Sequence, residues 1–316
     1  MKLPAELQFI ANAYLPQKST KKRLDGKLCV ITGATSGVGY QAAKHLAQAG
    51  ADLVLVCRNL EKAQQVRSEI LDISPVQVDV IRADFSRLPE VRAAAGAILE
   101  RHTRIDVLIN NAGMHNLRRE LTDEGYEKVF CVNHLASFLL TRLLLERMIQ
   151  SAPARIIQVN SQGHRFGGLN LDDLDWRKRP YLGLFGYGAS KVAQLLTIRE
   201  LSEYLQGSHV TINAMHPGAV RTNIGMNNGP LYRFYNRFIL RWFLKDASVS
   251  GEALYYLSAA TEMEGVSGHY FNLTIDEIPA PYAVNWQKSK RALQISEEMT
   301  GLEPLRKKVE KQPGGK

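Results

Sequence analysis

Short apolar runs alternate along most of this chain with longer segments in which apolar residues recur at helical spacing. The runs at 28–31, 53–57, 76–82, 105–110, 155–160, 210–216 and 268–271 are typical of buried parallel strands. Helical spacing is clearest over 40–48, 126–148 and 187–206. No linker or internal repeat interrupts the alternation. The pattern therefore predicts α/β architecture: one doubly wound domain with a mostly parallel seven-stranded sheet and helices on both faces.

This pattern extends over residues 26–301 and leaves two polar, basic ends. We expect 1–25 to be an N-terminal extension and 302–316 to be a flexible basic tail. The net charge is +9. The basic residues are concentrated near both ends and over 233–245. They do not form the kind of helical face that binds nucleic acid, which argues against nucleic acid as a partner. The excess charge fits an anionic cofactor, an acidic membrane surface or simple solubility.

The cysteines indicate a reducing compartment. Cys29 and Cys57 lie in expected strands, and Cys131 has no metal-ligand spacing to either, so no metal site is predicted. We find no signal peptide and no apolar run of membrane-spanning length. These features favour a cytoplasmic protein, with peripheral membrane contact as a further option.

A glycine-rich turn follows the first strand directly. Residues 32–39 read Thr-Gly-Ala-Thr-Ser-Gly-Val-Gly, and a helical segment begins at once. Glycines let the main chain approach a pyrophosphate, and a helix N-terminus favours its charge. The sequence therefore predicts a Rossmann-type dinucleotide site formed by Gly33, Thr35, Ser36, Gly37, Val38 and Gly39.

The end of the second strand selects between nicotinamide cofactors. A carboxylate there would accept hydrogen bonds from a ribose 2′-hydroxyl, whereas an arginine suits a 2′-phosphate. Arg58 occupies this position. We therefore expect NADP(H), with an ordinary solvated arginine as the alternative interpretation.

Tyr187 and Lys191 are spaced to share one helical face. A nearby ammonium favours the phenolate and brings the proton of a phenol into a useful range. Ser161 follows an expected strand, where its hydroxyl would hold a substrate oxygen beside the phenol. Asn133, in the helix over 126–148, would order a water for proton relay through Lys191, or its amide would simply bond to neighbouring main-chain groups.

With these motifs in this order, the chain resembles the short-chain dehydrogenases/reductases over about 26–301. The resemblance implies that Asn133, Ser161, Tyr187 and Lys191 form the catalytic tetrad and that Tyr187 and Lys191 also contact the cofactor. It further implies that Asp84 meets the adenine ring and that Thr222 contacts the nicotinamide amide. The remaining implied cofactor contacts are Asn110, Ala112, Gly113, Pro217 and Gly218.

Within that family the chain is similar to the retinol dehydrogenase-like group. The supporting strings are Leu-Val-Leu-Val-Cys-Arg-Asn at 53–59, Asn-Ser-Gln-Gly-His at 160–164 and the long insert at 165–185. Asn160 replaces the serine usual in that group. No N-terminal membrane anchor is expected, so retinol as the substrate does not follow. Relatives often dimerise through the helices at 126–148 and 187–206, which leaves monomer and homodimer both open.

Aromatic and basic residues alternate over 231–245, within an expected substrate lid at about 222–245. Arg233, Arg237, Arg241 and Lys245 recur every four residues. This segment reads either as a lid helix that packs its aromatic side chains on the domain or as an interfacial helix with its basic residues at headgroup level. Both interpretations imply an apolar substrate mouth. Met114, His115 and His164 either help to line it or serve as ordinary packing or surface residues.

The sequence thus predicts an NADP(H)-dependent oxidoreductase that interconverts a hydroxyl and a carbonyl on a lipophilic small molecule of the retinoid, steroid, long-chain or aromatic aldehyde type. The alternative is a non-catalytic NADP-binding regulatory or scaffold protein of the same fold.

Overall fold

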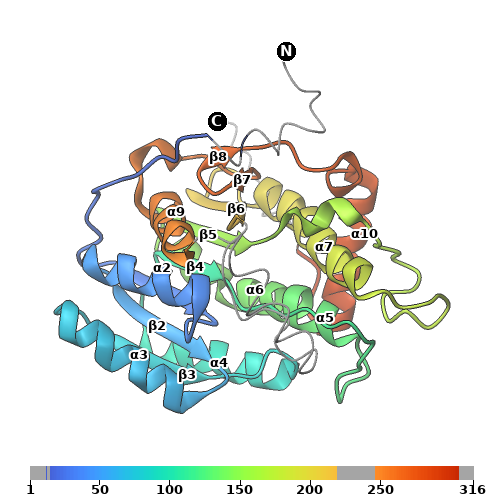
Figure 1. Ribbon diagram of the computed structural model, residues 1–316, viewed down its shortest axis with the longest axis horizontal. Helices are drawn as coiled ribbons and strands as arrows, with labels where there is room; N and C mark the ends of the chain where they lie inside the picture. The colour runs from blue at the N-terminus through green and yellow to red at the C-terminus, as the bar shows by residue number, and fades with distance from the viewer. Residues whose placement is uncertain (1–11, 13–14, 219–245, 306–316) are drawn as a thin grey trace, which may run out of the picture.

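An eight-stranded sheet forms the centre of the structure, a computed structural model that describes residues 12, 15–218 and 246–305 (Figure 1). Its strand order is β3-β2-β1-β4-β5-β6-β7-β8. Neighbouring strands are parallel except for the antiparallel pair β7–β8. The strands are β1 (Leu28–Thr32), β2 (Asp52–Cys57), β3 (Val78–Arg82), β4 (Val107–Asn110), β5 (Ala154–Val159), β6 (Val210–His216), β7 (Tyr270–Asn272) and β8 (Ile275–Asp276).

The doubly wound, mostly parallel sheet expected from the sequence is confirmed, with one strand more than the seven predicted. The extra strand, β8, has two residues and follows a tight turn in which Leu273 has φ 56°. Two residues show no periodicity, so the apolar pattern had no means of indicating this strand.

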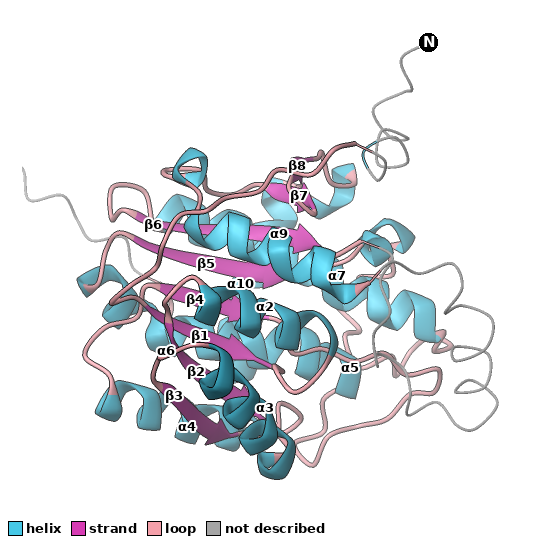
Figure 2. Cartoon of the chain, turned by 60° about the vertical axis from the view of Figure 1, so that its left-hand side comes forward, coloured by secondary structure: helices cyan, strands magenta, loops and turns pink. Residues whose placement is uncertain are grey.

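Helices cover both faces of the sheet, which explains why its central strands are apolar at nearly every position. Helices α2, α3 and α9 pack on one face, and α4, α6 and α7 pack on the other (Figure 2). Helix α10 lies outside α7. The helices are α2 (Gly37–Gln48), α3 (Leu60–Ile73), α4 (Leu88–Arg101), α5 (Lys128–Phe130), α6 (Ala136–Gln150), α7 (Gly183–Tyr204), α9 (Ala247–Ala259) and α10 (Trp286–Thr300), with short turns η2 (Cys131–Leu135), η3 (Gln162–Phe166), η5 (Thr261–Met263) and η6 (Pro281–Ala283).

Two helices that carry catalytic candidates differ from their expected form. The helix predicted at 126–148 runs over 128–150, but it contains a π-helical turn, η2, between α5 and α6. Helix α7 begins at Gly183, one turn before Tyr187. A Cβ on Gly188 would lie 2.7 Å from the Gly167 carbonyl oxygen. Glycine at this position therefore lets α7 pack directly against the turn η3.

The stretch Lys128–Gln150 is, among the described residues, long and apolar enough to cross a membrane by length and composition. This corrects the expectation that no apolar run reaches membrane-spanning length. Because 78% of its most apolar window is buried inside the domain, it serves here as a core helix. The expected lid, Thr222 and the basic tail from 306 onward lie outside the described residues.

Cys29, Cys57 and Cys131 are buried free thiols, in agreement with the sequence interpretation. Burial raises the pKa of Cys57 to about 11 and raises the pKa values of the other two further. All three thiols are therefore protonated at neutral pH and act as core side chains.

Candidate functional site

The predicted site residues gather at the carboxyl edge of the sheet. Strands β1 and β4 are neighbours, but the chain continues from β1 toward β2 and from β4 toward β5, so the order reverses between them. Open α/β sheets bind ligands at such a switch point. The glycine turn follows β1, the Asn-Asn-Ala-Gly segment follows β4, and Ser161 lies shortly after β5.

The glycine turn is shaped by close packing against the segment after β4. Gly33 and Gly37 have φ of 69° and 58°, in the left-handed region that favours glycine. A Cβ on Gly33 would lie 2.9 Å from Ala112 Cα, and a Cβ on Gly39 would lie 2.3 Å from Asn111 Nδ2. Larger side chains at these positions would push the two segments apart.

The N-terminus of α2 is open to an anion. Ser36 is its N-cap residue but makes no capping hydrogen bond with its side chain, and the first turn holds no acidic residue. The first N–H groups of a helix have no partner inside the helix, and they attract negative charge. Together with the glycine turn, this end fits the pyrophosphate of a dinucleotide. Val38, by contrast, is buried in the core.

Asn111 and Thr32 hold the two segments together. Thr32 was not a predicted site residue, whereas the resemblance implied Asn111 as part of the Asn-Asn-Ala-Gly segment that supports the central sheet beside the cofactor. Thr32 Oγ1 accepts hydrogen bonds from the main-chain N–H groups of Asn111 and Ala112, each at 2.9 Å. Asn111 Nδ2 donates to the carbonyl oxygens of Thr32 and Gly33. The side chain of Asn110 instead turns inward and donates to Thr141 on α6. The two adjacent asparagines indicated that an amide contacts the glycine turn. Their spacing did not show which of the two side chains does so.

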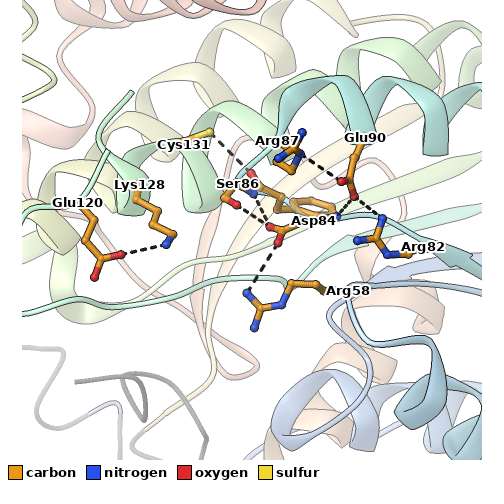
Figure 3. A network of polar contacts seen from close by, with 10 residues as sticks. Arg58, Arg82, Asp84, Ser86, Arg87, Glu90, Glu120, Lys128 and Cys131 are labelled. Atoms are coloured by element: carbon orange, nitrogen blue, oxygen red, sulfur yellow. Dashed lines mark hydrogen bonds and ion pairs between the residues drawn. The ribbon is translucent and has the colours of Figure 1, made fainter. Parts of the chain in front are cut away.

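Arg58 and Asp84 lie together after β2 and β3 (Figure 3). Arg58 Nη1 is 3.9 Å from Asp84 Oδ2, and the arginine side chain is 67% exposed. Asp84 Oδ1 accepts from the main-chain N–H and the hydroxyl of Ser86. The nearby Arg82 turns to Glu90 at 3.0 Å. Arg58 is thus the exposed cation at the end of β2, where a 2′-phosphate would be read.

Ser161, Tyr187 and Lys191 meet between η3 and α7. Ser161 hydrogen-bonds the Tyr187 hydroxyl, and its Oγ accepts from Gly163 N at 3.0 Å. Lys191 Nζ lies 5.6 Å from the centre of the Tyr187 ring and donates to the Val159 carbonyl oxygen at 2.9 Å. The structure therefore brings together three members of the predicted tetrad.

The pKa of Tyr187 differs from the value expected from the sequence. Burial raises the pKa of Tyr187, and the hydrogen bond from Ser161 offsets this only in part. Burial lowers the pKa of Lys191 to about 7. The expectation was that Lys191 lowers the pKa of the phenol. In this structure the ammonium is directed at the Val159 carbonyl, so desolvation dominates instead.

Asn133 lies in the π-helical turn η2 and is fully buried. Its side-chain Oδ1 accepts from Met114 N at 2.8 Å, and its Nδ2 donates to the Met114 carbonyl and to Ser190 Oγ. Protein groups thus occupy both ends of the amide that was expected to order a water. The side chain joins the segment after β4 to α7.

A buried amide chain connects three tetrad members. Gln194 Nε2 donates to the Asn133 carbonyl at 2.5 Å, and Gln194 Oε1 accepts from Asn160 Nδ2 at 2.9 Å. Asn160 Nδ2 also donates to the Lys191 carbonyl, while its Oδ1 accepts from Ser161 N. Only one orientation of the two amides satisfies every partner. The asparagine that departs from the usual serine therefore links the strand to α7.

The remaining predicted residues have mixed placements. Pro217 and Gly218 follow β6, and the Pro217 carbonyl accepts from Ser250 on α9. His115 packs its ring edge against Tyr187 at 5.5 Å between ring centres. His164, a candidate either for the substrate mouth or for packing, is a residue of η3 and is fully buried, so the structure favours the packing alternative.

Comparison with known proteins agrees with this geometry. The sequence model of the short chain dehydrogenase family matches residues 27–231. Human (Homo sapiens) retinol dehydrogenase 13 is 38% identical over 303 residues, covering 93% of this chain and 90% of that protein. Human retinol dehydrogenase 14 is 38% identical over 295 residues, covering 88% of each. The crystal structure of a protein from Mycobacterium paratuberculosis aligns with a TM-score of 0.72 at 29% identity, covering 90% of this chain and 97% of that one.

Proposed function

Because the chain belongs to the short-chain dehydrogenase family, in its retinol dehydrogenase-like group, we propose that it is an NADP(H)-dependent oxidoreductase that interconverts a hydroxyl and a carbonyl on a lipophilic small molecule. The observation that carries the proposal is the meeting of Ser161, Tyr187 and Lys191 beside the glycine turn. A protein that only bound the dinucleotide would need the turn but not this trio.

When bound, the nicotinamide supplies or accepts the hydride. Ser161 binds the substrate oxygen through its hydroxyl, which accepts from Gly163 N–H and hydrogen-bonds Tyr187, so a substrate oxygen held there lies beside the phenol. The raised pKa of Tyr187 keeps the phenol protonated at neutral pH, which suits it to donate a proton to a carbonyl oxygen. Lys191, with its pKa lowered to about 7, stabilises negative charge on the phenol when its Nζ is protonated.

A lipophilic substrate is supported by apolar side chains near the catalytic ring. The His115 ring touches Tyr187, and Leu117 follows two residues later. A Cβ on Gly183 would lie 2.8 Å from Leu117 Cα, so this segment adjoins the start of α7. The exposed large apolar side chains in the two segments are Leu117, Leu182, Leu184 and Phe185. The names of the relatives, retinol dehydrogenases 13 and 14, point to the same class of substrate.

The test is oxidation of NADPH in the presence of a panel of retinoid, aromatic and long-chain aldehydes. Tyr187→Phe should lower turnover by at least about 100-fold, because the proton donor is lost. Binding of NADPH, followed by its fluorescence, should stay close to that of the unmodified protein. Tyr255→Phe removes a hydroxyl that bonds to Lys22 on the far side of the domain and serves as the matched control.

Equal turnover by the Phe variant and the unmodified protein would show that Tyr187 is not the acid. Binding of NADPH without turnover of any aldehyde in the panel, nor of the matching alcohols with NADP, would favour a non-catalytic binding protein instead.

A further inference from the structure

The turn that carries Ser161 is fixed on both sides of that residue. On the amide side, Ser161 N donates to Asn160 Oδ1 at 2.8 Å. On the carbonyl side, the Ser161 oxygen accepts from the main-chain N–H of His164 at 3.1 Å and lies 2.8 Å from ring Nδ1 of the same residue. The His164 ring therefore adds a side-chain bond to the main chain of the catalytic serine.

The partners of His164 specify one tautomer of its ring. The Ser161 carbonyl can only accept, so Nδ1 must carry the proton. Nε2 lies 3.1 Å from Ala280 N, which can only donate, so Nε2 must present its lone pair. Burial lowers the pKa of His164 to about 4, so the ring is neutral at physiological pH. It thus acts as a rigid link with one donor and one acceptor.

The far end of that link is anchored in the segment after β8. Glu277 accepts hydrogen bonds from Gln162 at 2.6 Å and from Arg165 at 3.0 Å. The Tyr282 hydroxyl donates to the His164 carbonyl at 3.0 Å. Residues 277–282 therefore hold η3 on both sides of the His164 ring. The ring also meets Tyr270 edge-on, at 4.9 Å between centres.

A small movement of the turn η3 would displace Ser161 Oγ and the Tyr187 ring. A Cβ on Gly163 would lie 2.6 Å from the Tyr187 ring and 3.3 Å from Ser161 Oγ. The turn therefore packs against the catalytic phenol so closely that even a methyl group at position 163 would clash with it. A shift of about 1 Å in a catalytic group can cost on the order of 100-fold in rate.

We propose that His164 is a positioning residue: the bond from its Nδ1–H to the Ser161 carbonyl, anchored through Nε2 on the Ala280 amide, fixes the turn that directs the Ser161 hydroxyl at the substrate oxygen. This role rests on the proposed oxidoreductase function, because it requires Ser161 to bind a substrate. His164 itself touches neither substrate nor cofactor.

Two substitutions separate this role from simple packing. The amide of His164→Asn reaches the place of ring Nδ1 and keeps the donor to Ser161, whereas the amide of His164→Gln reaches the place of Nε2 and keeps the acceptor for Ala280. Both should lower the unfolding midpoint in urea to a similar extent. With NADPH and the aldehyde that the unmodified protein reduces fastest, His164→Gln should lower kcat at least about tenfold, and His164→Asn should recover most of it. The KM for NADPH should stay unchanged in both.

Tyr255→Phe is the control, because it removes a hydroxyl bond to the Lys22 carbonyl and contacts neither η3 nor residues 277–282. It should leave kcat unchanged. Equal kcat for the Asn and Gln variants would overturn the proposal, since packing alone would then explain the residue. An independent measurement is the ¹⁵N NMR spectrum of the labelled histidine ring, in which Nδ1 should be the protonated nitrogen; protonation at Nε2 would also overturn it. A protein that shows this tautomer but reduces no aldehyde would instead contradict the proposed function.

Discussion

We expect Arg58 to decide between the two nicotinamide cofactors. It directly follows β2, its guanidinium is largely exposed, and its 3.9 Å approach to Asp84 is a loose surface pair. Exposed pairs of this kind contribute little, so the guanidinium is free to turn to a phosphate. A 2′-phosphate offers oxygens in the geometry that an arginine matches best.

We expect the unmodified protein to bind NADP(H) at least about tenfold more tightly than NAD(H), or roughly 1.4 kcal/mol. Arg58→Ala should remove the difference by weakening NADP(H) binding, as measured by fluorescence titration. Arg82→Ala is the matched control, because Arg82 is also exposed but pairs with Glu90 instead. Equal affinities for the two cofactors in the unmodified protein would contradict the assignment.

Helix α10 covers the outer side of α6, of the turn η2 that carries Asn133 and of α7, which carries Tyr187 and Lys191. Its buried Glu297 pairs with Arg142 on α6, and both side chains are less than a tenth exposed. Ser296 Oγ lies 2.7 Å from Nε2 of His134 in η2, and Ser289 donates to Glu200 on α7. A homodimer formed through α6 and α7 would have to displace these contacts.

The Arg142–Glu297 pair should dominate the docking of α10. Glu297→Leu leaves the buried guanidinium without its counter-charge and should lower the free energy of unfolding by roughly 3–5 kcal/mol. The double variant Arg142→Met/Glu297→Leu should recover most of that loss, because an apolar pair of similar volume replaces the ions. Urea unfolding of the purified variants measures both values.

A second ion pair on the same helix provides the control. Arg291 pairs with Asp172, but both side chains are more than half exposed. Asp172→Asn should therefore change the free energy of unfolding by less than about 1 kcal/mol. Similar losses from Asp172→Asn and Glu297→Leu would show that burial of the Arg142–Glu297 pair is not what holds the helix.

Buried neutral histidines make the whole domain sensitive to acid. Burial lowers the pKa of His134 to about 3 and the pKa values of His164 and His216 to about 4. In the unfolded chain the same rings have a pKa near 6.5. Below about pH 6.5 the unfolded chain therefore takes up protons that the folded protein does not. The raised pKa of the buried Glu127 acts in the opposite direction, but it is a single group.

Stability should accordingly fall between pH 6.5 and about 4, by up to about 1.4 kcal/mol per pH unit for each of these histidines. His134→Gln keeps a polar group at the place of ring Nε2 but does not titrate, so it should make the decline shallower by about one histidine's share. Urea unfolding at pH 7, 6 and 5 measures the slopes. A slope that the substitution leaves unchanged would mean that other groups carry the effect.

The sequence by itself determined the architecture and the order of the motifs. Buried parallel strands are apolar throughout, and a glycine-rich string between such a strand and a helix is easily recognised. The strand β1, the turn after it and the helix α2 were therefore predicted. Tyr187, Lys191 and Ser161 were identified because their spacing and their places at strand and helix ends are local properties. Local properties of this kind can be recognised from the sequence alone.

Tertiary structure alone decided which polar groups face one another. The sequence did not distinguish Asn110 from Asn111, yet one bonds to α6 and the other holds the glycine turn. It left open whether His164 lines the substrate mouth or packs in the domain, whereas the fold buries its ring between Ser161 and Ala280, residues more than a hundred positions apart. The pKa of Tyr187 also moved opposite to expectation, because desolvation depends on everything packed around the phenol. Hydrogen-bond partners and burial arise from contacts between segments that are distant in the sequence, so the periodicity of apolar residues cannot predict them.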